Sequence, residues 1–187
     1  QDVCSSDLTA VGMSASYSLT TGNKNTAIGK NALYSTTTPN YNTAIGVNAL
    51  YNNVTGTQNV AVGNNASGQA TGSYNVGVGM NANRGSTTST YSGSNNVMVG
   101  TNTGVEFTTG FGNVGVGSFS MTNTTTGKNN TAVGGTSLNA NTTGNDNVAV
   151  GNVALSANTT GNDNTAVGMS ASYSRSEEHT SELQSPD

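Results

Sequence analysis

Small apolar and β-branched residues recur along this chain at a fixed interval, in a pentapeptide of the form Asn-Thr/Val-small-Ile/Val-Gly. Seven of the nine intervals between its final glycines are 17 residues, and the other two are 16 and 21. A short period repeated this often is typical of a solenoid, in which each repeat forms one coil that is stabilised by stacking on its neighbours. The motif glycines are Gly12, Gly29, Gly46, Gly63, Gly79, Gly100, Gly117, Gly134, Gly151 and Gly168.

The residues before each motif glycine predict a short strand. The position immediately before it is always Ile or Val, and a column of β-branched residues at one register indicates strands stacked in parallel, with this column in the core. The preceding position is Ala in seven repeats, Gly in two and Met in one. Because neighbouring strand residues point to opposite faces, these small residues lie on the second face and indicate close packing against another subunit.

The rest of the repeat completes one coil. The motif glycine is expected in a turn conformation that is unfavourable to other residues, and the apolar stretches 31–34, 48–51 and 153–155 predict a second strand. The motif asparagines predict a column of amides hydrogen-bonded from coil to coil. Representative structural repeat positions are Asn25, Ile28, Gly29, Asn42, Ile45, Gly46, Asn59, Val62, Gly63, Asn147, Val150 and Gly151.

Residues 9–174 are therefore predicted to form an all-β, parallel β-solenoid of about ten coils. At about 4.8 Å per coil the rod would be roughly 50 Å long. A single chain this thin has little core, so oligomerisation is expected.

The two ends fall outside the repeat, and both resemble translated sequencing-adapter DNA. Residues 175–185 can be encoded by an adapter that begins AGA TCG GAA GAG CAC ACG TCT, and residues 2–8 by its reverse complement. We interpret 1–8 and 175–187 as adapter-derived tails. The same ten residues occur at 9–18 and 165–174, which predicts that the chain is a metagenomic fragment of a longer repeat array.

Excluding the tails changes the composition. Cys4 and His179, the chain's Cys and His, lie in the tails, and the body has four cations against three acids, a formal net charge of +1. Such a body predicts no nucleic-acid partner and no membrane contact. It also predicts no enzyme activity and no cofactor or metal. The body's charged residues are Lys24, Lys30, Arg84, Lys128, Glu106, Asp146 and Asp163.

Asp146 and Asp163 occupy Gly-Asn-Asp-Asn stretches in two adjacent repeats. One carboxylate per coil faintly resembles a calcium-binding solenoid. Because Ca²⁺ needs several oxygen ligands, a turn-forming role for these aspartates is favoured.

The Asn-Thr-Ala-Ile-Gly and Asn-Val-Ala-Val-Gly units resemble the head repeats of YadA-like trimeric autotransporter adhesins. Residues 25–38 are still more similar to the long repeats of phage and bacterial tail-fibre proteins. The resemblance implies a left-handed parallel β-roll with three chains side by side, located outside a bacterial cell or on a phage virion tail fibre. The adhesin heads repeat at a shorter period, so the shape of the coil is expected to differ.

The expected function is a non-catalytic structural or adhesive segment of an extracellular fibre, acting as a homotrimer on a host-surface or matrix receptor. Loops and aromatic clusters on rigid scaffolds often carry recognition, which makes one group of residues a candidate contact surface. An alternative is that the Phe residues repack the core where the repeat is irregular, and packing is favoured for them. The group is Arg84, Tyr91, Phe107, Phe111 and Phe119.

A different alternative is an ice-binding or other single-chain β-solenoid. A Thr or Ser precedes the second glycine of every complete repeat, so hydroxyl groups are arranged in a column. However, the paired residues, such as Thr142 and Thr143, are adjacent. Adjacent strand residues point to opposite faces and do not form a flat double row.

Overall fold

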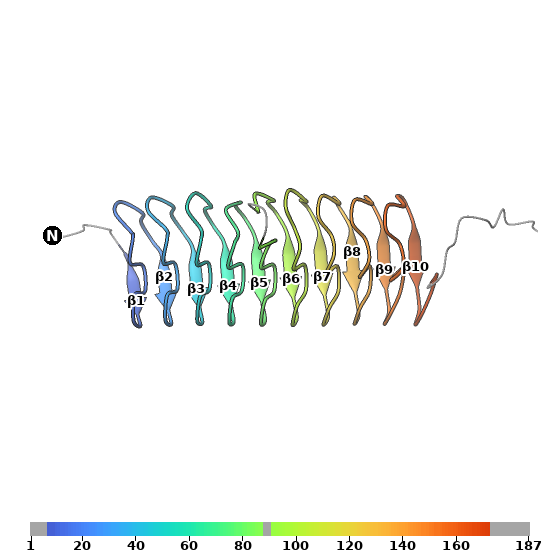
Figure 1. The fold of residues 1–187 in the computed structure, drawn as a ribbon, viewed down its shortest axis with the longest axis horizontal. Helices are drawn as coiled ribbons and strands as arrows, with labels where there is room; N and C mark the ends of the chain where they lie inside the picture. The colour runs from blue at the N-terminus through green and yellow to red at the C-terminus, as the bar shows by residue number, and fades with distance from the viewer. Residues whose placement is uncertain (1–6, 88–90, 173–187) are drawn as a thin grey trace, which may run out of the picture.

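The computed structural model describes residues 7–87 and 91–172, which form an elongated parallel β-solenoid (Figure 1). The predicted tails lie outside the described residues, apart from positions 7 and 8. Each coil contributes one three-residue strand, and the ten strands form a single sheet in the order β1 to β10. They are β1 (Thr9–Val11), β2 (Thr26–Ile28), β3 (Thr43–Ile45), β4 (Val60–Val62), β5 (Val76–Val78), β6 (Val97–Val99), β7 (Val114–Val116), β8 (Thr131–Val133), β9 (Val148–Val150) and β10 (Thr165–Val167).

Equivalent residues of successive motifs pair with each other throughout the sheet. Ala27 pairs with Ala44, and Ile28 pairs with Ile45. The same register holds between β4 and β5 and between β5 and β6, where the repeat lengths are 16 and 21. The turns therefore absorb the length changes, and the predicted in-register parallel solenoid is confirmed.

The faces of the strands are the reverse of the prediction. In β2 to β10 the central residue points inward and is buried, with Ala27, Ala44 and Ala61 at 0% exposure. The flanking residues are half-buried or exposed, and Ile28 and Ile45 remain 39% and 38% exposed. The predictions that the Ile/Val column forms the core and that the Ala column contacts another subunit are both wrong.

The width of the coil explains this reversal. The buried alanines of the strands pack against Ala32, Leu33, Ala49 and Leu50, which come from the turn that follows the motif glycine. A methyl group on the strand leaves room for a leucine from the opposite wall, whereas an isoleucine there would overpack the narrow interior. The larger β-branched side chains therefore occupy the outer face.

The predicted second strand is also wrong, because the stretches 31–34, 48–51 and 153–155 are turns. Asn31 and Leu33 have φ angles of 57° and 52°, in the left-handed region that extended strands do not use. This wall is nevertheless bonded from coil to coil, since the Leu33 amide donates to the Ala49 carbonyl at 3.0 Å. Each left-handed non-glycine residue costs about 1–2 kcal/mol, so stacking between coils must offset this strain.

The motif glycine is required by its conformation and by its surroundings. All ten have φ between 128° and 135°, which confirms the predicted special turn conformation. A Cβ atom added at Gly46 would lie 2.5 Å from the carbonyl oxygen of Gly63 and 2.7 Å from its carbonyl carbon. Successive coils therefore approach closely at this column, and the neighbouring atoms are backbone that cannot move aside.

We expect Gly46→Ala to lower the free energy of unfolding by at least about 3 kcal/mol, through φ strain and displacement of the next coil. The matched control is Gly135→Ala, because φ there lies outside the left-handed region and the nearest atom to an added Cβ is 3.6 Å away. The control should change stability by less than about 1 kcal/mol. Urea unfolding followed by circular dichroism measures both, and equal effects would contradict the close-stacking account.

The motif asparagines form a buried amide column inside the rod. The side chain of Asn113 donates to the Gly127 carbonyl at 2.9 Å, and its oxygen accepts from the backbone amide of Asn130 at 3.0 Å. The same pair of bonds recurs in the neighbouring coil, where Asn130 donates to Gly144 and accepts from Asn147. Each amide therefore satisfies two backbone groups of the following coil that have no access to water.

Replacing Asn113 with Ala should destabilise the protein by about 2–5 kcal/mol, because it leaves a buried carbonyl and a buried N–H group without partners. Asn64→Ala is the control, since Asn64 is exposed and other coils have Lys30 or Met80 at its position. That substitution should have an effect within about 0.5 kcal/mol. Similar urea midpoints for the two variants would argue against the amide column as a stabilising feature.

Candidate functional site

The outer face of the ten-stranded sheet runs along the rod, and we call it the strand face. It consists of the first and third residues of every strand, arranged in two parallel rows. The first row is Thr9, Thr26, Thr43, Val60, Val76, Val97, Val114, Thr131, Val148 and Thr165, and the second is Val11, Ile28, Ile45, Val62, Val78, Val99, Val116, Val133, Val150 and Val167.

The strand face is uncharged over its full length, and fifteen of its twenty positions are Val or Ile. The ten strands contain no charged residue, and the second row is entirely Val or Ile. Val114 and Val116 in the middle of the sheet remain 36% and 37% exposed, although their strand has neighbours on both sides. Exposed apolar residues scattered singly are normal, whereas an uninterrupted strip of them indicates a contact surface.

The structure separates the five residues of the predicted contact surface. Tyr91 and Phe107 are fully buried, with ring centroids 6.0 Å apart. Tyr91 aligns with Ala70 in a parallel bridge, so it continues a core column despite the preceding insertion. The contact role predicted for these two rings is therefore wrong, and the packing alternative applies to them.

The other three members of the group are at the surface in separate environments. Phe111 is 43% exposed beneath the Lys128 ammonium, which lies 5.2 Å from the ring centroid. Phe119 is 45% exposed. Arg84 forms an ion pair of 3.4 Å with Glu106, and both side chains are partly exposed. Ring contacts among the described residues join neither Phe111 nor Phe119 to the buried pair.

The Tyr91 hydroxyl joins a buried polar network. It donates to Oδ1 of Asn83 at 2.9 Å and accepts from Nδ2 of Asn96 at 2.9 Å. Burial raises the pKa of the Tyr91 phenol, because the phenolate loses its hydration, and the two amides only partly offset this effect. Tyr91 is therefore held neutral in the folded protein.

Tyr91→Phe should lower the free energy of unfolding by about 1–3 kcal/mol at neutral pH, because buried amides lose a hydrogen-bond partner. Since the folded-state pKa is raised, the stabilisation is fully present below the ordinary tyrosine pKa of about 10 and falls as pH rises above it. The difference in free energy of unfolding between wild type and Tyr91→Phe should therefore narrow between about pH 10 and 12. A gap in urea midpoints that stays constant over this range would contradict a buried neutral phenol.

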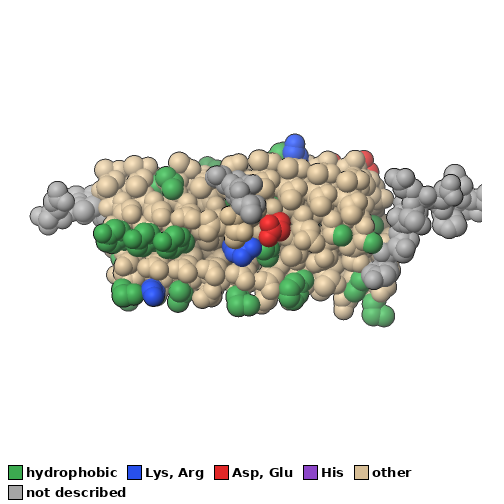
Figure 2. All heavy atoms as spheres, viewed as in Figure 1, with side chains coloured by type: hydrophobic (Ala, Val, Ile, Leu, Met, Phe, Trp, Pro, Cys, Tyr) green, Lys and Arg blue, Asp and Glu red, His purple; other side chains and the backbone are tan. Residues whose placement is uncertain are grey.

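A second surface was missed by the sequence analysis. Tyr17, Tyr34 and Tyr51 lie at the same position of three successive coils and stack with centroid distances of 5.1 Å and interplanar angles of 5–6°. Their spacing of 17 residues was the available signal. Figure 2 shows a continuous band of hydrophobic side chains over the N-terminal coils of the visible face.

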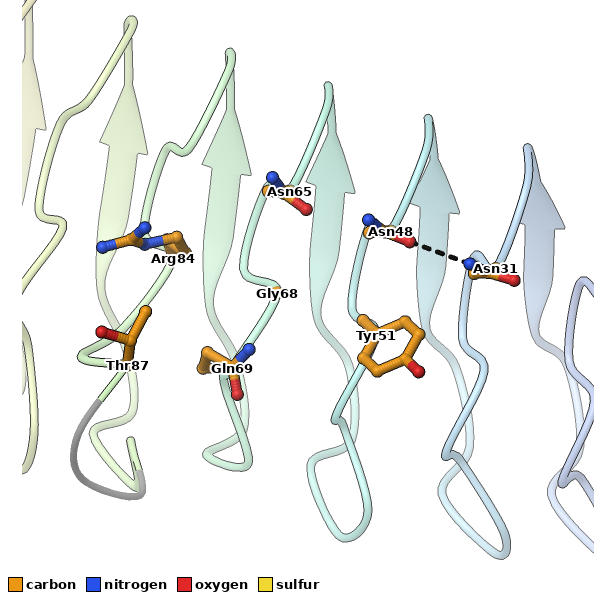
Figure 3. A pocket seen from close by; sticks show the side chains of 8 residues that line it. All are labelled: Asn31, Asn48, Tyr51, Asn65, Gly68, Gln69, Arg84 and Thr87. Atoms are coloured by element: carbon orange, nitrogen blue, oxygen red, sulfur yellow. Dashed lines mark hydrogen bonds between the residues drawn. The ribbon is translucent and has the colours of Figure 1, made fainter.

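A hollow lies next to this tyrosine ladder (Figure 3). Its volume is about 410 Å³, and it is lined by Asn31, Asn48, Tyr51, Asn65, Gly68, Gln69, Arg84 and Thr87. The lining is mostly polar and includes a single cation. A smaller hollow of about 340 Å³ lies near the other end of the rod, without aromatic or charged residues.

The described part of the chain has little reactive chemistry. It contains no group of three or more His, Cys, Asp or Glu residues placed to hold a metal ion. Asp146 and Asp163 both occupy left-handed turn positions, with φ of 57° and 56°. No helix among the described residues has the length and apolar character to span a bilayer.

The fold and these surfaces define the class of protein as a parallel β-solenoid rod with 17-residue coils. No protein-family model, curated protein or solved structure matches the chain.

Proposed function

We propose that the chain is a non-catalytic structural and adhesive segment of an extracellular fibre, and that three copies associate through their strand faces. The fibre would be the head of a bacterial trimeric adhesin or the shaft of a phage tail fibre. The repeat resemblance described above supports this location, the left-handed β-roll and the number of chains. The observation that carries the proposal is the exposed, uncharged strand face.

Two features of the strand face favour association between copies of the chain. The ten strands lie side by side in one row along the rod (Figure 1), so identical copies can align along their whole length. It also has two rows of side chains. Around a threefold axis, each row of one chain faces a different neighbour, which removes both rows from water.

A rigid rod of similar coils suits adhesion by many weak contacts. Each coil presents its turn residues at a spacing of about 4.8 Å from the next. Three parallel chains would display every such contact in three copies, so that tethering raises the overall affinity for a repetitive host-surface or matrix receptor. A spacer in a tail fibre would use the same rod without a receptor.

Ice binding is the second candidate, and one observation favours it. The strand face provides two flat rows of side chains two residues apart, an arrangement that the Thr-Thr turns do not provide. However, only five of the twenty positions bear hydroxyl groups. The turn hydroxyls are also engaged between coils, as where Thr142 donates to the Thr159 carbonyl at 3.0 Å. Thermal hysteresis in concentrated protein would support this candidate over the fibre.

The full chain should have a solution mass of three times 18.7 kDa by light scattering. Ile45→Lys should reduce the mass to that of a monomer, because it places a charge between apolar strand faces. Val47→Lys is the control, since Val47 is 41% exposed, close to the 38% of Ile45, but lies outside the strand face. A monomeric wild type, or equal effects of both variants, would contradict the proposal.

A further inference from the structure

The tyrosine ladder ends at a glycine, and this leaves a gap one residue wide. The fifth residue after each motif glycine forms a single column along the rod. In consecutive coils this column is Tyr17, Tyr34, Tyr51, Gly68 and Arg84. One face of the Tyr51 ring stacks on Tyr34, and the fourth position has no side chain to cover the other face.

The gap has the width of one ring. Tyr51 and Arg84 belong to coils two steps apart, so their attachment points are separated by about 9.6 Å. The ladder spaces its rings by 5.1 Å, so a ring inserted above Gly68 would have Tyr51 on one side and the coil that bears Arg84 on the other. Figure 3 shows Tyr51 and Arg84 on opposite sides of Gly68. We call this gap the Tyr51–Arg84 slot.

Amide groups provide hydrogen-bonding partners beside the slot. The side chain of Asn31 donates to Asn48 at 3.1 Å, but the equivalent bond from Asn48 to Asn65 is not made. The Asn65 side chain makes no hydrogen bond to another described residue, and Gln69 uses only its oxygen, which accepts from Asn52. The Asn65 amide and the Gln69 NH₂ group are therefore available to a ligand.

The charge of the slot is nearly balanced. Arg84 is its only cation, and Glu106 lies 3.4 Å from one guanidinium nitrogen. This single contact leaves other N–H groups of the guanidinium without a partner, because arginine has five donors. The slot therefore has no strong net field, and its amide groups favour a neutral, hydrogen-bonding ligand over an anion.

We propose that the Tyr51–Arg84 slot binds a neutral pyranose ring of a glycan. Such a ring has an apolar C–H face that can cover Tyr51 and hydroxyl groups at its edge that can reach Asn65 and Gln69. An aromatic ligand would cover the tyrosine equally well but would leave these amides dehydrated and without partners, at a cost of about 1–3 kcal/mol each. The hollow of about 410 Å³ is within the size range of small-molecule sites.

The slot adds a ligand class to the proposed adhesive function. Only the biological role of the slot rests on that function, because binding of a glycan does not require the chain to be part of a fibre. No residue of the strand face lines the slot. A glycan-binding experiment tests the slot, and the solution mass tests the association of strand faces, so either result can be negative without affecting the other.

The test is saturation-transfer NMR of the full chain with methyl glycosides of glucose, galactose, mannose and N-acetylglucosamine as probes, and indole as the aromatic comparison. At least one glycoside should bind the wild type with millimolar affinity. Gly68→Tyr, which extends the ladder into the slot, should weaken this binding at least tenfold. Its φ is not left-handed, and the closest atom to an added Cβ, the Asn65 carbonyl oxygen, is 3.3 Å away, so a side chain requires a shift of only a few tenths of an ångström.

Two further variants complete the design. Tyr51→Ala removes the ring face without adding volume and should also abolish binding, so the test holds even if Gly68→Tyr folds poorly. Tyr17→Ala removes an equivalent ring at the far end of the ladder and should leave affinity unchanged. Absence of binding by all four glycosides, preference for indole, or binding that survives Tyr51→Ala would overturn the proposal.

Discussion

Close stacking of successive coils is the constraint on which the rest of this structure depends. At the motif glycines from Gly12 to Gly151 the backbones approach so closely that no Cβ atom fits, and φ near 130° excludes other residues. The same stacking places each motif asparagine where its amide satisfies two backbone groups of the next coil, as Asn113 does. A narrow rod with few large apolar side chains can remain folded because hydrogen bonds and backbone contacts are repeated in every coil.

The functional surfaces are consequences of this narrow coil. Nine of the ten strands have Ala or Gly at the centre, so Ala44 faces inward and Ile45 remains at the surface. The rod therefore carries an apolar strip that a single chain cannot bury, which is the basis for the proposed trimer. In-register stacking also converts a repeated tyrosine into a ladder, and one glycine at Gly68 into a gap in that ladder.

The period, the parallel register and the special conformation of the motif glycine could be predicted from sequence, because each depends only on the spacing and type of residues. The direction of the strand faces could not, since alternation at Ala27 and Ile28 defines two faces without saying which is inside. The left-handed conformations at Leu33 and Leu50 could not be predicted either, because leucine rarely adopts them and the stretch has the composition of a strand. The burial of Tyr91 could not be predicted from sequence either, because it depends on where the coil accommodates the inserted residues.

A crystal structure of the full chain would test the central claim most directly. The account predicts the alanine column inside each coil, and the Val and Ile rows of three chains meeting along a common axis. A structure in which the alanines lie at a contact between chains, with the β-branched residues inside the coil, would contradict it.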